Sequence, residues 1–450
     1  MKELKTFPYL ERFFYFVRLV VRKFSTWNVK EMVSLIKIGL LGFGTVNSGV
    51  YEGITDTLSY LEQLLGDSVS VEKILIRDKQ KYSNNSNDEL LTDVADDFFK
   101  HEYHVVFEAM GGEQPALDYV TFLLTKRIPV ITANKELIAK HGSKLESLAK
   151  KYETFIGFEA TVAGGIPIIN TLKSQLQWTS VEKVSGILNG TTNYIITSLQ
   201  EGNRTFESVL REAQELGFAE ADPTSDVEGY DALYKLQILC RLCFGSWPTP
   251  EQFQRTGMSH LKSWHFKAGD YFQLKLKYIA EAYYDGHEVK GSISPTFVEE
   301  KHPLSSIINE NNGIFLQGDW LGNFVASGPG AGKKPTATSM IEDYLHQLQN
   351  KTFKQTPIKR KVVNHVDTKE YLVLYDIANE KEIYQFLKLV TYRVDKVVQF
   401  ENKEKVAMLI TANQLLPSIK SADQPVDIFP VLRVNTKVEK FTVETQLKAL

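Results

Sequence analysis

The stretch Leu35-Ile36-Lys37-Ile38-Gly39-Leu40-Leu41-Gly42-Phe43-Gly44-Thr45-Val46-Asn47-Ser48-Gly49-Val50 decides the fold class of this chain. Its first half, up to Leu41, is an apolar, β-branched run with the length of a buried strand. The glycines that follow allow a tight turn and a close approach of backbone N–H groups to a pyrophosphate at a helix N-terminus. Asn47 stands where this fingerprint normally has a third glycine. The order of strand, glycine turn and helix still predicts a dinucleotide-binding domain.

Further strands follow at the spacing of alternating strands and helices, at Val69–Ile76, Tyr103–Glu108 and Ile128–Lys135. This alternation predicts an α/β fold with a doubly wound, parallel, Rossmann-like sheet. Since such sheets bind ligands at the carboxyl ends of their strands, Met110–Gly112 and Thr132–Lys135 fall at the expected mouth. We therefore expect Lys135 to have a functional role.

The second strand ends at Arg77 and Asp78, where this fold contacts the cofactor ribose. An acid there favours a 2′-hydroxyl and an arginine favours a 2′-phosphate. Because both residues are present, the choice between NAD and NADP is left open, and Arg77 favours NADP.

Composition is that of an ordinary globular protein of about two or three domains. Hydrophobic residues make up 43% of the 450 residues and charged residues 24%. A net charge of −3 gives no electrostatic footprint for nucleic acid. Cys240 and Cys243 lie in an apolar helical run, so we interpret them as core residues rather than a redox pair, and so few cysteines suit the cytoplasm.

Residues 1–33 form an N-terminal extension with an apolar and aromatic run, Phe13–Arg22. Arg18 and Arg22 interrupt the run, which is too short to span a membrane. No small-residue cleavage site follows it, so a secretory signal is not expected. We expect either a packing arm or translation that begins at Met32, and no membrane association.

A glycine-rich turn opens the next region, in Phe158–Ile169. Such a turn can present backbone carbonyl oxygens to a hard cation, or it can be a close-packed turn without an ion. Farther along, Val184–Tyr194 leads from a strand into a turn rich in hydroxyls and amides, which suits a small polar ligand.

The stretch Gly217–Lys235 places several carboxylates beside a helix with a single lysine. If Pro223 lies in the first turn of that helix, Asp231 and Lys235 share one helical face. Converging charges suit a zwitterionic substrate, whereas the plainer interpretation is an acid-capped helix with an ordinary ion pair.

Taken together, these segments resemble homoserine dehydrogenase. The matching pieces, in the family's order, are GLLGFGTV, EAMGG, TANKELIAKHG, FEATVAGGIPII, GILNGTTNYI, EAQELGFAEADPTSDVEGYDALYK and GPGAG at 328–332. The resemblance implies interconversion of L-homoserine and L-aspartate 4-semialdehyde with NAD or NADP, in threonine, methionine and isoleucine biosynthesis. It also implies a homodimer or homotetramer.

The resemblance assigns roles residue by residue. Lys235 matches a catalytic proton donor, and Lys135 a second active-site lysine near both cofactor and substrate. Glu220 and Asp231 match the acids that bind homoserine. The remaining matches are cofactor contacts at Phe43, Thr45, Val46, Gly217 and Gly330, and a sodium ion bound by the backbone carbonyls of Glu159, Val162, Gly164 and Ile166. Asp222, Asp226 and Glu228 are interpreted as capping or supporting residues.

The chemistry of the residues agrees with these roles. A lysine has a pKa of ~10.4, which burial lowers and a close carboxylate raises. Asp231 therefore opposes the use of Lys235 as a base and favours its ammonium form as the proton donor for aldehyde reduction.

Five segments organise the chain: the extension 1–33, a dinucleotide-binding domain 34–157, a substrate-binding, catalytic and dimerisation domain 158–350, a linker 351–365 and a C-terminal module 366–450. Residues 319–345 are expected to return toward the cofactor domain. The domain 158–350 is expected to have an α+β fold. In the C-terminal module we expect strands at Tyr371–Asp376, Val394–Phe400 and Lys405–Thr411 and a helix at Lys381–Val390. This order resembles a ferredoxin-like ACT domain, but Asp376–Lys381 lacks the family's Pro-Gly turn, so regulation and inert dimerisation both stay open.

Two other functions compete with the dehydrogenase. A non-catalytic homologue that binds a nucleotide or amino acid would explain Asn47 and the divergent C-terminal module. A semialdehyde or sugar-phosphate dehydrogenase of similar fold is the other, but the semialdehyde enzymes need a nucleophilic cysteine, and both cysteines lie in the core-like run.

Overall fold

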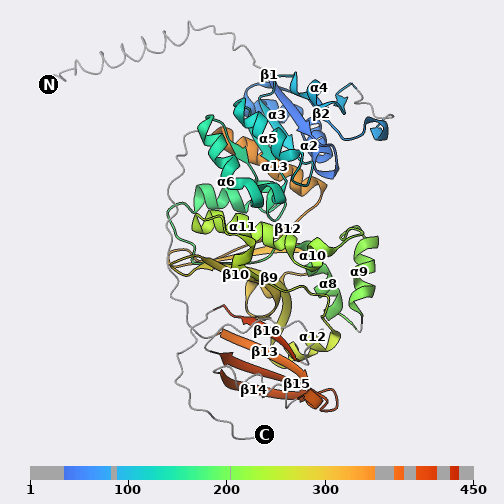
Figure 1. Cartoon of the computed structure of the whole chain (residues 1–450), viewed down its shortest axis with the longest axis vertical. Coiled ribbons are helices and arrows are strands. Elements are labelled where there is room, and N and C mark those ends of the chain that lie inside the picture. The colour runs from blue at the N-terminus through green and yellow to red at the C-terminus, as the bar shows by residue number, and fades with distance from the viewer. Residues whose placement is uncertain are drawn as a thin grey trace, which may run out of the picture.

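The computed structural model describes residues 35–82, 89–202, 204–349, 369–379, 392–412 and 426–434. Three layers of structure follow one another along the longest axis of the molecule (Figure 1). The predicted linker, the N-terminal extension and the predicted helix Lys381–Val390 lie outside the described residues, and the domain boundaries stay predictions.

A parallel sheet forms the first layer and confirms the Rossmann-like expectation. All its strands are parallel, in the order β3-β2-β1-β4-β5-β6. From β1 the chain first builds the sheet outward through β2 and β3, and then returns to add β4 on the other side of β1. The place between β1 and β4 is therefore the topological switch point, where sheets of this type bind ligands. The strands are β1 (Leu35–Leu41), β2 (Ser68–Leu75), β3 (Leu91–Thr92), β4 (Val105–Glu108), β5 (Val130–Thr132) and β6 (Ile156–Gly157).

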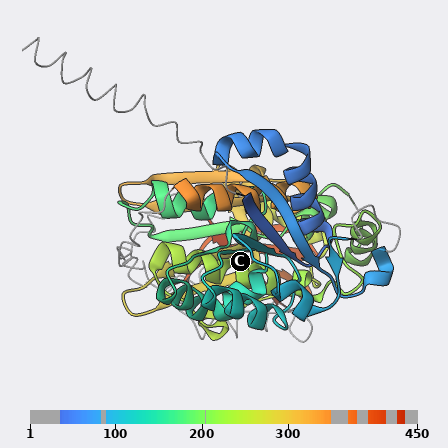
Figure 2. The ribbon, with the colours of Figure 1, turned by 90° about the horizontal axis from the view of Figure 1, so that it is seen from above.

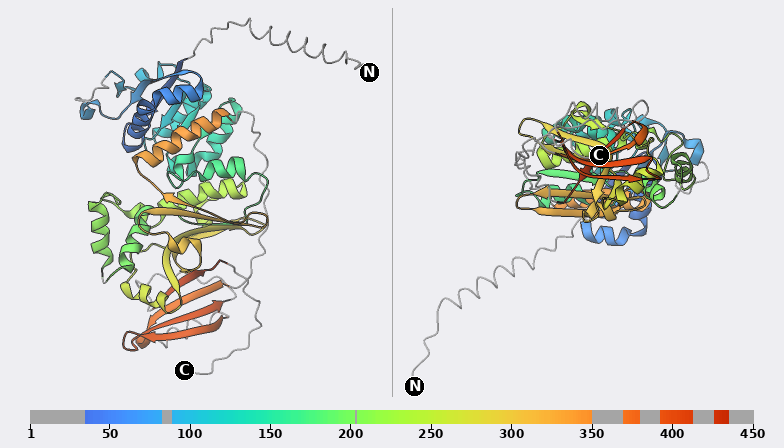
Figure 3. Two further views of the ribbon diagram at one scale, coloured as in Figure 1. Left: turned by 180° about the vertical axis from the view of Figure 1, so that it is seen from behind. Right: turned by 90° about the horizontal axis from the view of Figure 1, so that it is seen from below.

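Helices cover both faces of this sheet, as the apolar strands require, with the blue helices on one side and the teal helices on the other (Figure 2). They are α2 (Thr45–Asp56), α3 (Leu58–Leu65), α4 (Ala95–Phe99), α5 (Ala116–Thr125) and α6 (Lys135–Lys151). The late helix α13 (Lys333–Gln349) packs against α2. Figure 3 shows α13 in orange beside the blue helices. Gly49 makes this packing possible, because a Cβ atom there would lie 2.8 Å from the Lys333 carbonyl oxygen.

A mixed sheet forms the second layer, and helix α11 (Tyr230–Phe244) lies between it and the first layer (Figure 1). Its strands are β7 (Lys183–Ile187), β8 (Phe253–Arg255), β9 (Leu274–Tyr284), β10 (Val289–Glu299), β11 (Asn311–Gly318) and β12 (Gly322–Pro329). The accompanying helices are α7 (Ile168–Asn170), α8 (Gly190–Gln200), α9 (Phe206–Glu215), α10 (Thr224–Val227), α11 (Tyr230–Phe244) and α12 (Ser263–Asp270).

The third layer continues the second sheet. Strand β16 (Val426–Leu432) pairs in parallel with β10 and leads into β13 (Lys369–Asp376), β15 (Lys405–Ala412) and β14 (Tyr392–Phe400). The three predicted C-terminal strands are confirmed at β13, β14 and β15, whereas β16 was not predicted. Neighbouring strands among β16, β13, β15 and β14 are antiparallel.

Candidate active site

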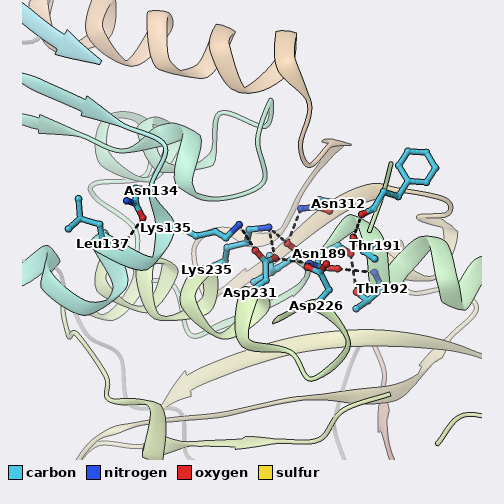
Figure 4. A network of polar contacts seen from close by, with 12 residues as sticks. Asn134, Lys135, Leu137, Asn189, Thr191, Thr192, Asp226, Asp231, Lys235 and Asn312 are labelled. Atoms are coloured by element: carbon cyan, nitrogen blue, oxygen red, sulfur yellow. Dashed lines mark hydrogen bonds and ion pairs between the residues drawn. The ribbon is translucent and has the colours of Figure 1, made fainter. Parts of the chain in front are cut away.

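Three of the predicted site residues, Lys135, Asp231 and Lys235, meet where α6 of the first layer touches α11 of the second (Figure 4). Asp231 is at the centre and is 3% exposed. One of its oxygens, Oδ1, lies 2.7 Å from Lys135 Nζ, and Oδ2 lies 2.8 Å from Lys235 Nζ. The two lysines come from different layers, so only the tertiary fold brings them to one carboxylate.

The helix that carries Asp231 and Lys235 begins later than Pro223 suggested. Pro223 precedes the separate short helix α10, and Gly229, at φ 80°, then turns the chain into α11. A left-handed conformation of this kind favours glycine, and a Cβ atom at Gly229 would lie 2.3 Å from the Tyr278 hydroxyl. Asp231 and Lys235 are still one turn apart on α11, so the expected ion pair forms although the expected helix start was wrong.

Lys235 is held by backbone as well as by charge. Its ammonium donates to the Leu188 carbonyl at 2.7 Å, and Asn312 Nδ2 donates to the same oxygen at 3.0 Å. The side chain of Lys235 is only 9% exposed. Burial lowers the pKa of Lys235, and Lys135 adds to this, although Asp231 acts in the opposite direction.

The pKa values of the two other charged groups, Lys135 and Asp231, shift in the directions that favour their ionised forms. Asp231 raises the pKa of Lys135, whose side chain is 42% exposed, against the effect of desolvation. Burial alone would raise the pKa of Asp231, but Lys235 and Lys135 together lower it below its usual range. The site therefore contains a firmly ionised acid, a firmly protonated lysine and a second lysine whose proton is more easily released.

Asn189 is a site residue that the sequence did not single out. Its Nδ2 donates to Asp231 Oδ2 at 2.8 Å and to Asp226 Oδ1 at 2.7 Å, while its Oδ1 caps α8 by accepting from the Thr192 backbone N–H. The amide-rich turn suggested a polar contact, but no pattern identified which amide faces the carboxylates.

Asp226 belongs to this network as a supporting residue, one of the two roles expected for it. Burial raises the pKa of Asp226, and the neighbouring Asp231 adds to the rise. Asp222, by contrast, accepts bonds from Thr224 in the local turn, and Glu228 lies 3.9 Å from Arg255.

Glu220 lies at the exposed edge of the site, and among the described residues its side chain pairs with neither lysine. Its charge contributes to the raised pKa of Lys135. Gly217 ends the preceding helix in the left-handed region at φ 78°, with open space around it.

The predicted cofactor loop lies at the switch point between β1 and β4. Thr45 is exposed, and Phe43 and Val46 are partly exposed. Gly42 has φ 86°, and a Cβ atom there would lie 2.9 Å from the Ala109 carbonyl oxygen, so glycine is required. Arg77, at the end of β2, is exposed.

Asn47 strengthens this loop instead of disrupting it. The side chain is fully buried, and Nδ2 donates to the carbonyls of Leu41 and Gly42 at 2.9 Å and of Phe107 at 3.2 Å. It thus connects the ends of β1 and β4, a contact that the glycine of the usual fingerprint cannot make.

Gly330 and the glycine turn of residues 159–166 lie side by side. A Cβ atom at Gly330 would lie about 2.1 Å from Asn312, and one at Gly164 would lie 2.6 Å from the Gly330 carbonyl group. Ala163 and Gly164 both have positive φ, of 55° and 49°. Among the described residues, no group of three or more His, Cys, Asp or Glu side chains could hold a metal ion.

Two structural findings limit the alternatives. Cys240 and Cys243 are buried in α11 as free thiols, and burial raises the pKa of both, so neither has the properties of an attacking thiolate. Within the described ranges, no helix is both long and apolar enough to cross a bilayer.

Comparison with known proteins gives one family throughout. The profile described as homoserine dehydrogenase matches residues 167–345, and the profile of the homoserine dehydrogenase NAD-binding domain matches residues 42–159. A homoserine dehydrogenase of Bacillus subtilis is 40% identical over 70% of this chain and 73% of its own length. One from Lactococcus lactis is 34% identical over 81% of this chain and 88% of its own length. The crystal structure of a homoserine dehydrogenase from Thiobacillus denitrificans superposes with a TM-score of 0.79 at 26% identity, over 89% of this chain and 99% of that one.

Proposed function

This chain belongs to the homoserine dehydrogenase family, and from that premise we propose how its residues interconvert L-homoserine and L-aspartate 4-semialdehyde. The observation that carries the proposal is the group of Lys135, Asp231 and Lys235 beside the switch point of a Rossmann-like sheet. A nicotinamide coenzyme accepts or supplies the hydride when bound.

Lys235 is the proton donor in the direction of aldehyde reduction. Its ammonium has three N–H donors, and the described contacts use two of them, on Leu188 and Asp231. The third is available to the substrate oxygen. As the hydride adds to the aldehyde carbon, that oxygen gains negative charge and takes the proton from Nζ, which leaves a hydroxyl group and a neutral amine. In the reverse direction the same amine accepts the hydroxyl proton.

Asp231 and Glu220 bind the substrate ammonium group, and Lys135 completes the site from the cofactor side. In this structure Lys135 and Lys235 occupy both oxygens of Asp231, so the substrate ammonium has to share that carboxylate with them. The exposed Glu220 offers a second anion nearby.

A steady-state assay tests the proposed function. Aspartate semialdehyde is mixed with NADPH or with NADH, and oxidation of the coenzyme is followed at the same protein concentration. We expect oxidation of at least one coenzyme at a rate that the Lys235→Ala variant does not approach. A protein that binds coenzyme yet oxidises neither would instead be the non-catalytic homologue.

For the coenzyme, we propose a preference for NADP because Arg77 is exposed at the end of β2. Arg77→Ala should raise KM for NADPH more than KM for NADH. Equal changes would assign the ribose contact to another residue. Contacts by Phe43, Thr45, Val46, Gly217 and Gly330 complete the proposed coenzyme site.

We also propose a sodium ion at the backbone carbonyls of Glu159, Val162, Gly164 and Ile166. The Gly164 oxygen accepts from Ser339 Oγ at 2.6 Å and the Ile166 oxygen from the Ile168 N–H at 2.8 Å, and each carbonyl retains a second lone pair for a cation. The Glu159 carboxylate is engaged elsewhere, on the backbone N–H groups of Ile169 and Asn170. Replacing sodium by choline at constant ionic strength should lower the melting temperature, and an unchanged value would contradict the site.

The C-terminal strands support a ferredoxin-like, ACT-like module, since the order β16-β13-β15-β14 is antiparallel throughout. Threonine added to the assay separates the two roles left open: inhibition indicates a regulatory module, and no effect indicates dimerisation alone. We place the enzyme in the cytoplasm as a homodimer or homotetramer, and light scattering of the purified protein measures the assembly.

A further inference from the structure

Glu108 is a buried acid that the reaction described above does not use. It is the last residue of β4, directly opposite Leu41 of β1, so it stands at the switch point where the coenzyme is proposed to bind. Its side chain is fully buried, with an exposed fraction of 0%. An ionisable group in such a place needs partners, because a buried charge without them is strongly unfavourable.

Both carboxylate oxygens of Glu108 accept hydrogen bonds, one from each of two loops. Oε1 accepts from the Met110 backbone N–H at 2.8 Å, and Oε2 is in contact with the Thr132 hydroxyl. Thr132 Oγ1 itself accepts from the Asn134 backbone N–H at 2.9 Å. The Thr132 hydroxyl thus donates its single hydrogen to Glu108 while its oxygen accepts from the Asn134 N–H.

Asn134 extends the connection to the first residue of α6. Its Nδ2 donates to the Gly112 carbonyl at 2.7 Å, and its Oδ1 caps the helix by accepting from the Leu137 N–H at 3.1 Å. Lys135 follows directly and reaches Asp231. Gly111 and Gly112, with positive φ and open space beside them, complete the loop on the ligand side.

We propose that Glu108 is a positioning residue: it ties the loop 109–112 to the loop 132–134 and so fixes both the coenzyme mouth and the start of α6, from which Lys135 reaches Asp231. The part of this inference that concerns Lys135 rests on the proposed function. The connection between the two loops does not depend on it. Burial raises the pKa of Glu108 above its usual value, although the bonds from Thr132, Met110 and Asn134 act in the opposite direction.

Glutamine cannot replace Glu108 in this arrangement, although it has the same shape. If its amide oxygen faces Met110, its NH2 group faces Thr132, whose hydroxyl hydrogen then has no acceptor. In the opposite orientation the NH2 group faces the Met110 N–H, and two donors meet. Either way one buried donor loses its partner.

The test measures coenzyme binding directly, by the fluorescence of NADPH, together with steady-state kinetics and melting temperature. We expect Glu108→Gln to raise Kd for NADPH about tenfold, since one buried donor is left without an acceptor. Thr132→Val should also raise Kd for NADPH, whereas Thr132→Ser, which retains the hydroxyl, should have the wild-type Kd. The double variant Glu108→Gln/Thr132→Val should show less than the product of the two single effects.

A matched control is available in the C-terminal strands. Thr411 is 1% exposed and donates to Oδ2 of the exposed Asp395 at 2.6 Å, so Thr411→Val breaks a partly buried hydroxyl–carboxylate bond far from the coenzyme mouth. It should lower the melting temperature and leave Kd for NADPH unchanged.

Two results would overturn the inference. One is a Glu108→Gln protein that, like Thr411→Val, loses melting temperature without a change in Kd. The other is a full additional loss of turnover when Lys135→Ala is combined with Glu108→Gln, because Glu108 would then not act through Lys135. If wild type binds NADPH but does not turn over, the proposed function fails while the binding comparison still decides the role of Glu108.

Discussion

Two places in this molecule hold the same three charges, a buried carboxylate between two lysines. One is Asp231 with Lys135 and Lys235, and the other is Glu281 of β9 with Lys183 and Lys369. In the second group the Nζ atoms lie 2.8 Å and 3.3 Å from the Glu281 oxygens. Lysines on both sides lower the pKa of each carboxylate against the opposing effect of burial.

The difference lies in the surroundings of the lysines. Lys183 and Lys369 have side chains that are 26% and 25% exposed, and they join β7 and β13 to β9. Lys235 is buried and shares a backbone carbonyl with Asn312, and Asn189 joins its partner Asp231 to a second acid, Asp226. The same three charges therefore connect strands at Glu281. At Asp231 one of the two lysines, Lys235, is desolvated, as the proposed proton donor requires.

The largest expected effect separates the two groups by turnover. Lys235→Ala should lower kcat by about a thousandfold, since a positioned proton donor contributes roughly 10²–10⁴. Its counterpart Lys183→Ala should retain kcat within about twofold, because Lys183 only pairs with Glu281 near the surface. Steady-state kinetics at saturating coenzyme measures both, and coenzyme Kd should not change in either variant. Comparable losses in the two variants would remove the functional distinction between the groups.

Neutralising the central acid should lower mainly stability at Glu281 and mainly activity at Asp231. Glu281→Gln leaves two lysines without their shared anion and should lower the free energy of unfolding by about 3 kcal/mol at neutral pH, with the rate unchanged below the melting transition. Asp231→Asn should raise KM for homoserine at least about tenfold, because the substrate ammonium loses its carboxylate. Denaturant unfolding and initial rates are measured on the same preparations. An Asp231→Asn enzyme with wild-type KM would contradict the assignment.

The stability difference at Glu281 should depend on pH with a definite sign. The folded-state pKa of Glu281 is lowered, so its contribution is present above the unfolded value of ~4.3 and is lost as pH falls through the folded value. Unfolding curves of wild type and Glu281→Gln should therefore approach each other below about pH 4. Curves that stay equally separated there would show that packing, and not charge, causes the difference.

The pH dependence of the rate should follow Lys235 alone. Aldehyde reduction uses its protonated form, and its pKa is lowered by burial, so kcat should fall as pH rises through a value below the ~10.4 of an ordinary lysine. The profile of Lys183→Met should coincide with that of wild type. A displaced profile in Lys183→Met would mean that the distant group influences the chemistry.

The smallest effect is expected at the outer lysine of the second group. Lys369→Met should lower the free energy of unfolding by about 1 kcal/mol or less, because the pair is partly exposed and 3.3 Å apart. Thermal unfolding measures the change. A much larger loss would show that this contact holds the C-terminal strands to β9, in addition to the pairing of β16 with β10.

The sequence predicted the parallel sheet because its strands are apolar runs punctuated by glycine turns, and β1 has the predicted bounds, Leu35–Leu41. It predicted less where the pattern was ambiguous. The run Val426–Leu432 was not recognised as β16, since it contains Pro430 and an acid, Asp427, that is 5% exposed in the structure. The helix start at Pro223 was wrong because the left-handed turn at Gly229 depends on space beside Tyr278, a contact distant in sequence.

Residue types and short spacings were thus determined by the sequence itself: a glycine loop after a strand, an Asp and a Lys four residues apart, and a lysine after a strand end. Local geometry alone produces these, because each depends on a few consecutive dihedral angles. Only the tertiary structure decided that Lys135 meets Asp231, that Asn189 joins Asp231 to Asp226, and that Glu281 holds a similar pair of lysines, both partly exposed. Burial is the physical reason, since the desolvation that distinguishes Lys235 from Lys183 comes from residues far away along the chain.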